Sequence, residues 1–202
     1  MSFQLAWIIP VAAFFASSET PQKGYSLLDA YGEFVKACEA VKAADDFSLS
    51  LEKQGWEKFE PKAEEPMGRL VAYLASERWR LEKDSSAIVN TPNTFKHNIS
   101  GGKLELMVQE FLVGEGKVVG CRAWDFNPIR KPTINEIVEL KSEPPNRKIS
   151  STDLLMAEWG ESEDGILLGS QIHFIPPDGR SAKALGVSGL SFKMSFIRIS
   201  KQ

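Results

Sequence analysis

Hydrophobic positions follow a helical period in the first part of the chain. Within residues 26–43 the apolar positions recur every three or four residues and share one helix face: Leu27, Tyr31, Phe34, Cys38 and Val41. Ser26 precedes this run and Asp29 lies three positions later, an arrangement that satisfies free N–H groups at a helix start. The pattern predicts an amphipathic helix over 26–43 with Cys38 facing the core.

Further helix signals follow. Asp45 or Asp46 can begin a short helix that Gly55 ends. After it we expect Trp56 to fold back onto the core, and a solvated connector at 57–66. A third helix is predicted from Met67 to about Lys83, and Thr133 and Glu136 form a capping box for a short helix ending near Leu140.

After Asn90 the pattern changes, and from residue 93 it shows the alternation typical of strands. The predicted strands cover residues 95–99, 104–113, 118–126, 154–159, 165–175 and 191–196. Segments 142–150 and 176–190 are rich in Pro, Gly or Ser and are predicted to be loops. The order predicts an α+β fold: an antiparallel sheet of five to six strands with the N-terminal helices packed on one face.

The first eighteen residues carry no charged side chain, and Leu5–Phe15 is an apolar run of eleven residues. This length suits the apolar region of a signal peptide and is too short for a membrane-spanning helix. Small residues at Ala16-Ser17-Ser18 favour a cut before Glu19, although the segment has no Lys or Arg at its start. We therefore expect a signal peptide at 1–18 and a single domain at 19–202. The alternative is that residues 1–18 belong to the fold of a cytosolic protein.

The chain has two cysteines, Cys38 and Cys121. An even number in an exported chain indicates one disulfide. Alternation places Cys121 on the inner face of its strand, so a disulfide would fix the first helix to that face of the sheet. In a cytosolic protein the same residues would be two buried thiols.

Composition excludes several classes of protein. The hydrophobic share is 43%, which excludes a disordered chain, and the net charge of −3 gives no basic excess for nucleic-acid binding. Five basic residues lie in 165–202, among them Lys193, which alternation assigns to solvated sheet surface.

Catalytic motifs are absent from the sequence: it contains no zinc-protease, phosphate-loop or serine-hydrolase pattern. The best enzyme hypothesis is a thiol-dependent hydrolase in which Cys121 is the nucleophile and His97 the base. No two potential metal ligands have the close spacing of a zinc site. We therefore expect no catalytic residue, no metal and no cofactor.

One pair of residues predicted to lie on the surface is the candidate binding site. Arg122 and Trp124 alternate with Cys121 and so lie on the other sheet face, where a protein, lipid or polymer of the cell envelope could bind. The competing interpretation is that the 133–140 helix, or the loop after it, covers Trp124. We expect no transmembrane span and a monomer.

Three fragments carry a resemblance: Phe34-Val35-Lys36-Ala37-Cys38, Gly55-Trp56 and Gly120-Cys121. They resemble a loose pattern in small exported proteins of unknown function from Gram-negative bacteria. The resemblance implies a periplasmic location and supports pairing Cys38 with Cys121, and it implies no catalytic residue. The resulting hypothesis is an exported, non-enzymatic binding or structural domain.

Overall fold

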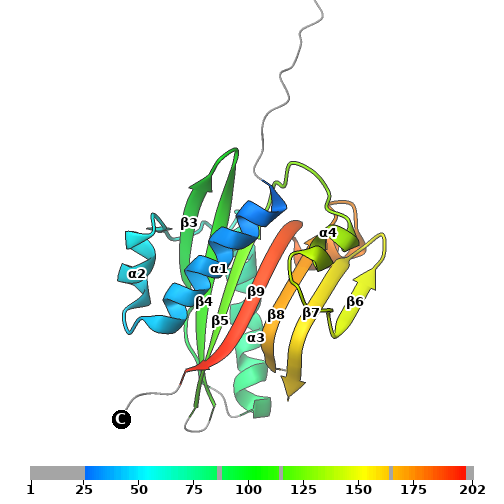
Figure 1. The fold of residues 1–202 in the computed structure, drawn as a ribbon. Helices are drawn as coiled ribbons and strands as arrows, with labels where there is room; N and C mark the ends of the chain where they lie inside the picture. Colours follow the sequence, from blue (N-terminus) through cyan, green and yellow to red (C-terminus); the bar gives the residue numbers. More distant parts are fainter. Residues whose placement is uncertain (1–25, 86–87, 114–115, 164–165, 199–202) are drawn as a thin grey trace, which may run out of the picture.

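One antiparallel sheet with helices packed against both of its faces forms the structure, a computed structural model that describes residues 26–85, 88–113, 116–163 and 166–198 (Figure 1). The helices are α1 (Leu27–Ala43), α2 (Phe47–Lys53), α3 (Pro66–Ser85), α4 (Ile134–Glu139) and α5 (Arg180–Leu185). The strands are β1 (Glu57–Lys58), β2 (Ile88–Val89), β3 (Asn93–Ile99), β4 (Gly102–Val113), β5 (Gly116–Asp125), β6 (Arg147–Ser150), β7 (Leu155–Glu163), β8 (Ile166–Ile175) and β9 (Gly189–Arg198). The predicted signal peptide at 1–18 lies outside the described residues.

The C-terminal strand lies in the middle of the sheet. The strand order is β1-β3-β4-β5-β9-β8-β7-β6, and the short β2 pairs with β4 beside β3. Every pairing is antiparallel, as expected from runs of strands joined by turns. Because β9 pairs with both β5 and β8, it joins the β1-β3-β4-β5 part of the sheet to the β8-β7-β6 part.

The first core lies between the sheet and α1, on the face that carries Cys121, which we call the disulfide face. In Figure 1, α1 runs diagonally across the front of β4, β5 and β9. Phe34 of α1 stacks on Phe192 of β9 with ring centroids 5.5 Å apart, and both side chains are buried. Leu51 of α2 and Ile137 of α4 complete this core. The apolar stripe of the predicted first helix therefore packs as expected.

A second core lies on the opposite face, which we call the α3 face. Met67 and Leu70 of α3 pack there with Met107, Trp124 and Ala182, the last from α5. The expectation that the helices cover one face only is therefore wrong. The pleat sends Met107 and Trp124 to the side opposite their neighbours along the strand, so apolar side chains on both faces need a cover. Figure 1 shows α3 behind the sheet.

Local signals in the sequence located most helix ends. Ser26 and Asp29 form the predicted capping box of α1, Asp46 caps α2, and Thr133 and Glu136 form the box of α4. Gly55 follows α2 with a φ of 85°. These confirmed predictions rest on hydrogen bonds that a few adjacent residues make among themselves.

Three predictions about loops and strand number are wrong. The sheet has nine strands instead of five to six, because β1, β2 and β6 are two to four residues long, too short to show alternation. The predicted loop at 142–150 contains β6, which pairs with β7, and the predicted loop at 176–190 contains α5. The N-cap residue of α5 is Gly179, which has no side chain, and the N–H of Arg180 donates instead to Oδ1 of Asp153, a residue distant in the chain, so no local signal indicates the start of α5.

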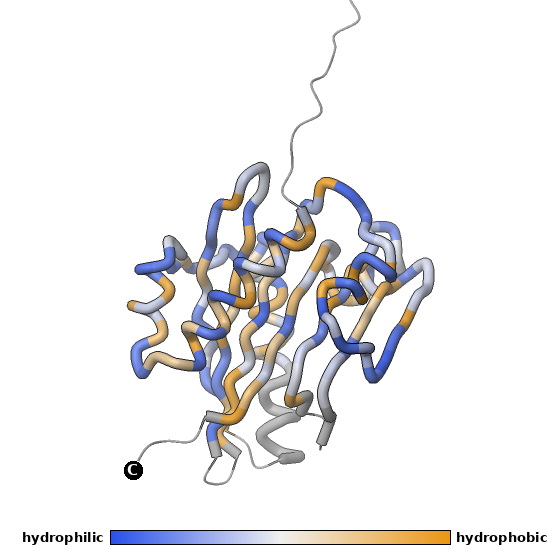
Figure 2. Tube along the Cα trace, viewed as in Figure 1, coloured by the Kyte–Doolittle hydropathy of each residue, from blue (hydrophilic) through white to orange (hydrophobic). Residues whose placement is uncertain are grey.

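Hydropathy along the chain follows this layering. Figure 2 shows hydrophobic and hydrophilic residues alternating along the strands of the sheet.

In the described part of the chain, none of the helices combines the length and the apolar character that crossing a membrane requires.

Candidate functional site

The two cysteines form a disulfide inside the first core. Cys38 of α1 is bonded to Cys121 of β5 across a Cα–Cα distance of 5.9 Å, and both side chains are fully buried. This confirms the predicted disulfide and its geometric consequence, since the bond ties α1 to the inner face of the sheet.

His97 and Cys121 do not form a nucleophile–base pair. The ring of His97 stacks on Trp56 at 5.0 Å, and its Nδ1 lies 2.9 Å from the carbonyl oxygen of Gly55. Its Nε2 lies 3.9 Å from the carboxylate of Glu33. The sulfur of Cys121 is bonded to Cys38, and the described residues include no free cysteine. His97 thus joins α1, the turn after α2 and β3, a structural role.

Trp124 is not a surface group. It is 1% exposed, stacks on Phe126 at 5.4 Å and meets the ring of His173 edge-on at 5.2 Å. The interpretation that Trp124 is covered is confirmed, but the cover is the cluster of α3 and α5 instead of the 133–140 helix. Ile137 of that helix packs on the disulfide face.

Arg122 belongs to a line of polar residues across four strands of the α3 face. Arg122 of β5 lies opposite Lys193 of β9, which lies opposite Gln171 of β8, which lies opposite Glu158 of β7. We call these four residues the charged row. All four are half-buried, and the exposed Arg147 of β6 extends the row beyond Glu158.

Burial lowers the pKa of both cations of the charged row, and the charge of Arg122 adds to the effect at Lys193. Burial and then the charge of Arg122 lower the pKa of Lys193 to about 8, against a smaller opposing effect of Glu158. Burial also lowers the pKa of Arg122, whose guanidinium nevertheless stays charged. Among described residues, no ion pair is formed by Arg122 or Lys193.

The two carboxylates that the neighbouring strands β4 and β7 place beside the charged row each have another partner. Glu158 accepts a hydrogen bond of 2.8 Å from Nε2 of Gln171. Glu105, which lies on the same face and diagonally across from Arg122, forms an ion pair with Lys103. On the flank away from Lys193, the residue opposite Arg122 is the apolar Met107.

A buried line of residues borders the charged row on one side. Trp124, Ser191 and His173 lie opposite one another on β5, β9 and β8. The indole Nε1 of Trp124 and the Oγ of Ser191 are buried and find no hydrogen-bond partner among the residues that the structure describes. Burial, followed by the charges of Arg122 and Lys193, lowers the pKa of His173 to about 3, so its ring is neutral at neutral pH.

Small residues border the charged row on its other side. Gly120, Ser195 and Gly169 lie opposite one another on β5, β9 and β8. Gly169 and its partner Gly160 need to be glycine, because both have positive φ and a Cβ would lie within 2.3 Å of a carbonyl oxygen. Gly120 has no such requirement, since an added Cβ would come no closer than 3.6 Å to any atom outside its chain neighbours.

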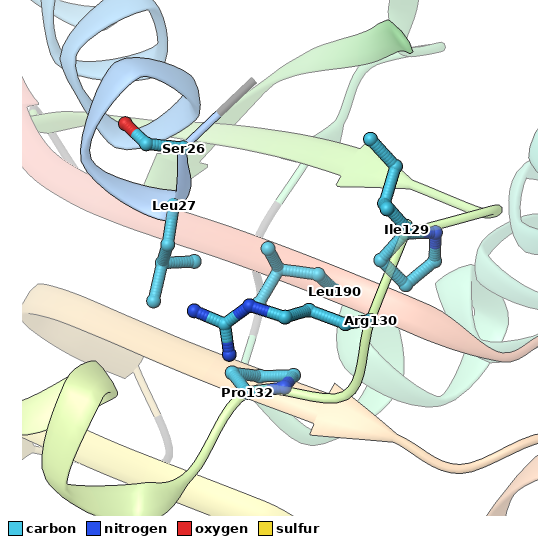
Figure 3. Close-up of a pocket in the computed structure, with 7 residues that line it drawn as sticks. Ser26, Leu27, Ile129, Arg130, Pro132 and Leu190 are labelled. Atoms are coloured by element: carbon cyan, nitrogen blue, oxygen red, sulfur yellow. The ribbon is translucent and has the colours of Figure 1, made fainter. Parts of the chain in front are cut away.

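An open hollow of about 100 Å³ lies at the start of α1 (Figure 3). Its walls are Leu27, Leu190 and the loop after β5, where Ile129 is exposed. The guanidinium of Arg130 reaches into this hollow and binds the carboxylate of Glu136, which lowers the pKa of Glu136 to about 2. Since the charge of Arg130 is already paired, the hollow is a weaker candidate than the charged row.

Sequence reasoning identified Arg122 but assigned Lys193 to solvated surface. Alternation gave the correct face for both residues. Their juxtaposition depends on β9 pairing with β5, across more than sixty positions of chain, and no local pattern indicates that pairing.

No protein-family model matches this chain, and no curated protein or solved structure was found to match it. The described residues also contain no group of three His, Cys, Asp or Glu side chains that could hold a metal ion. The fold and the charged row therefore define the class of protein only as a disulfide-linked α+β protein with a half-buried cationic pair.

Proposed function

We propose that this protein is exported to an oxidising compartment, the periplasm or the cell exterior, and acts there as a binding or structural domain, not as an enzyme. The observation that carries the proposal is the buried bond between Cys38 and Cys121. Disulfides persist in oxidising compartments and are rare in the cytosol. The same bond occupies the sulfur of the nucleophile in the best enzyme hypothesis.

The predicted signal peptide at 1–18 and the resemblance to exported Gram-negative proteins support the same location. A protein, lipid or polymer of the cell envelope is the expected partner. The α3 face is not an open sheet surface, because α3 and α5 cover it at Trp124. A ligand would therefore bind at the half-buried residues beside that cover.

Expression of the whole chain in a Gram-negative host tests the location. We expect the protein in the periplasmic fraction, with a mass that corresponds to an N-terminus at Glu19 and no thiol that reacts with a thiol reagent in denaturant. The matched control is Ile9→Arg, which places a charge in the apolar run and should keep the chain in the cytosol. An uncut cytosolic chain with two reactive thiols would overturn the proposal in favour of the cytosolic alternative.

The alternative of a thiol-dependent hydrolase applies only to reduced protein. An assay with a small activated ester compares reduced wild-type protein with Cys121→Ser and His97→Gln. We expect the same background rate in all three proteins. A rate that requires both Cys121 and His97 would favour the hydrolase.

A further inference from the structure

We propose that Arg122 and Lys193 bind the oxyanion of a monoanionic group, the chemistry that a carboxylate and a phosphodiester share. This rests on the binding role proposed above and names the class of ligand. The site is the charged row on the α3 face, and the ligand group would lie between the guanidinium and the ammonium.

The first argument is that placing the two cations side by side costs folding free energy. Arg122 and Lys193 lie directly opposite each other on adjacent strands. Like charges in such a cross-strand pair destabilise a sheet, and partial burial of cations adds a desolvation cost. Both costs fall when an anion lies between the two groups, because each cation then gains a charge-assisted hydrogen bond.

The second argument is the charge that the row leaves uncompensated. Glu158 is hydrogen-bonded to Gln171, and Glu105 is paired with Lys103. Even when Glu158 is counted in full, the half-buried row keeps one net positive charge. One monoanionic group restores neutrality without a further cation.

The third argument is donor geometry. A guanidinium offers two parallel N–H groups to the two oxygens of a carboxylate or phosphodiester, and an ammonium adds a compact third donor. The neutral His173 does not add to the charge. Next to Arg122 on the same face, the partly exposed Gly120 has no side chain, although the ring of Phe111 lies 3.6 Å from where its Cβ would be.

The test is a titration of the purified mature protein with acetate and with dimethyl phosphate, followed by the amide NMR signals. Potassium chloride at equal ionic strength is the blank. We expect saturable shifts at Gly120, Lys193 and Ser195 in the wild-type protein. Arg122→Gln and Lys193→Met should each weaken binding at least about tenfold, since each removes one of the two cations that donate charged hydrogen bonds to the ligand.

The matched control is Lys148→Met, which removes an equal charge from an exposed position of β6 whose side chain lies on the disulfide face. It should bind like the wild-type protein. No saturable shift in the wild-type protein, or equal shifts in Lys148→Met and the two site variants, would overturn the proposal.

Stability without ligand gives a second measurement. Because the cations repel each other, the Arg122→Gln/Lys193→Met variant should melt at the same or a higher temperature than the wild-type protein in a buffer without oxyanions. A lower melting temperature would mean that the cations stabilise the fold itself, which would also overturn the proposal.

Sedimentation with vesicles identifies the source of the oxyanion. Binding to phosphatidylglycerol but not phosphatidylcholine vesicles, lost in the double variant, would support the site with a lipid head group. Shifts with small anions but no vesicle binding would support it with a free ligand. These measurements use purified protein and do not depend on where the protein is located in the cell. A negative result would therefore overturn the oxyanion proposal only, and the export proposal would still be decided by the expression experiment.

Discussion

Cys38 and Cys121 are 83 positions apart in the chain, and their bond joins the middle of the first helix to a central strand. Both sulfur atoms are surrounded by the first core, where α1 contacts β4, β5 and β9. The bond therefore closes a long loop within the larger of the two hydrophobic clusters.

Reduction of this bond should destabilise the protein. The loss of a cross-link over a loop of this length corresponds to about 4–5 kcal/mol in the chain-entropy treatment, with smaller values often measured. Urea denaturation with and without dithiothreitol measures the difference. The Cys38→Ser/Cys121→Ser variant is the control and should not respond to the reductant; an equal response there would show that the effect does not come from the bond.

Gly160 and Gly169 should tolerate no side chain. They lie opposite each other on β7 and β8 with φ values of 115° and 152°, and an added Cβ would lie 2.3 Å and 2.1 Å from a facing carbonyl oxygen. Gly160→Ala and Gly169→Ala should each lower the free energy of unfolding by at least about 1–3 kcal/mol, the cost of a strained backbone conformation.

Gly32→Ala is the matched control for these variants. Gly32 lies inside α1, and nothing is within 4 Å of the Cβ that alanine would add. Alanine favours a helix interior over glycine by about 1 kcal/mol, so this variant should be more stable than the wild-type protein. Equal free energies of unfolding for all three variants in urea denaturation would contradict the close backbone contact of β7 and β8 at Gly160 and Gly169.

Asp125 should make the protein less stable as the pH rises from about 4 to 6. Its Oδ2 is buried and has no hydrogen-bond partner within the described part of the chain, and burial raises the pKa of Asp125 to about 6 from an ordinary 3.8. In this window the folded protein keeps a proton that the unfolded chain releases, so the free energy of unfolding falls as the pH rises, by at most roughly 3 kcal/mol.

Asp125→Asn isolates this contribution, because the amide cannot titrate and its oxygen can still accept the hydrogen bond from the N–H of Asn127. Urea denaturation at pH 4, 5, 6 and 7 is measured on both proteins. The difference in free energy of unfolding between the two proteins should change between about pH 4 and 6 and become constant above about pH 7. A difference that is the same at every pH would contradict an elevated pKa of Asp125.

His173 should have the opposite effect. Its folded-state pKa is about 3, whereas an unfolded histidine has a pKa near 6.5. As the pH falls below about 6.5, the unfolded chain takes up a proton that the folded protein excludes. The free energy of unfolding should therefore fall by roughly 3 kcal/mol between pH 6.5 and 4.

His173→Phe keeps an aromatic ring at the edge of Trp124 and removes the titration. The variant should lose less stability on acidification than the wild-type protein, as measured by denaturation at pH 7 and pH 4. Equal losses in the two proteins would mean that His173 accepts a proton in the folded state. The Asp125 and His173 variants can be compared directly, since their effects on the pH dependence have opposite signs.

The predictions that held depend on residues close together in the chain. Ser26 with Asp29 and Thr133 with Glu136 formed their capping boxes because a spacing of three positions brings the groups together at a helix start. The strand alternation that placed Cys121 inward also placed Arg122 on the other face. Each of these relationships is complete within one element.

The predictions that failed depend on pairing between distant segments. β6 has the polar sequence Arg-Lys-Ile-Ser and is a strand only because β7 offers it a free edge. Trp124 is buried because α3 crosses to the face opposite α1, although both helices carry similar apolar stripes. An apolar stripe shows that a helix needs a partner, but not which face of the sheet provides it.

By itself the sequence determined the class of fold, the starts of the principal helices, the inward side of each long strand and the two cysteines available for a bond. Only the tertiary structure decided that β9 lies between β5 and β8, and therefore that Lys193 lies opposite Arg122. The physical reason is that periodicity is a local property of the backbone, whereas the neighbour of a strand is selected by the packing of the whole sheet.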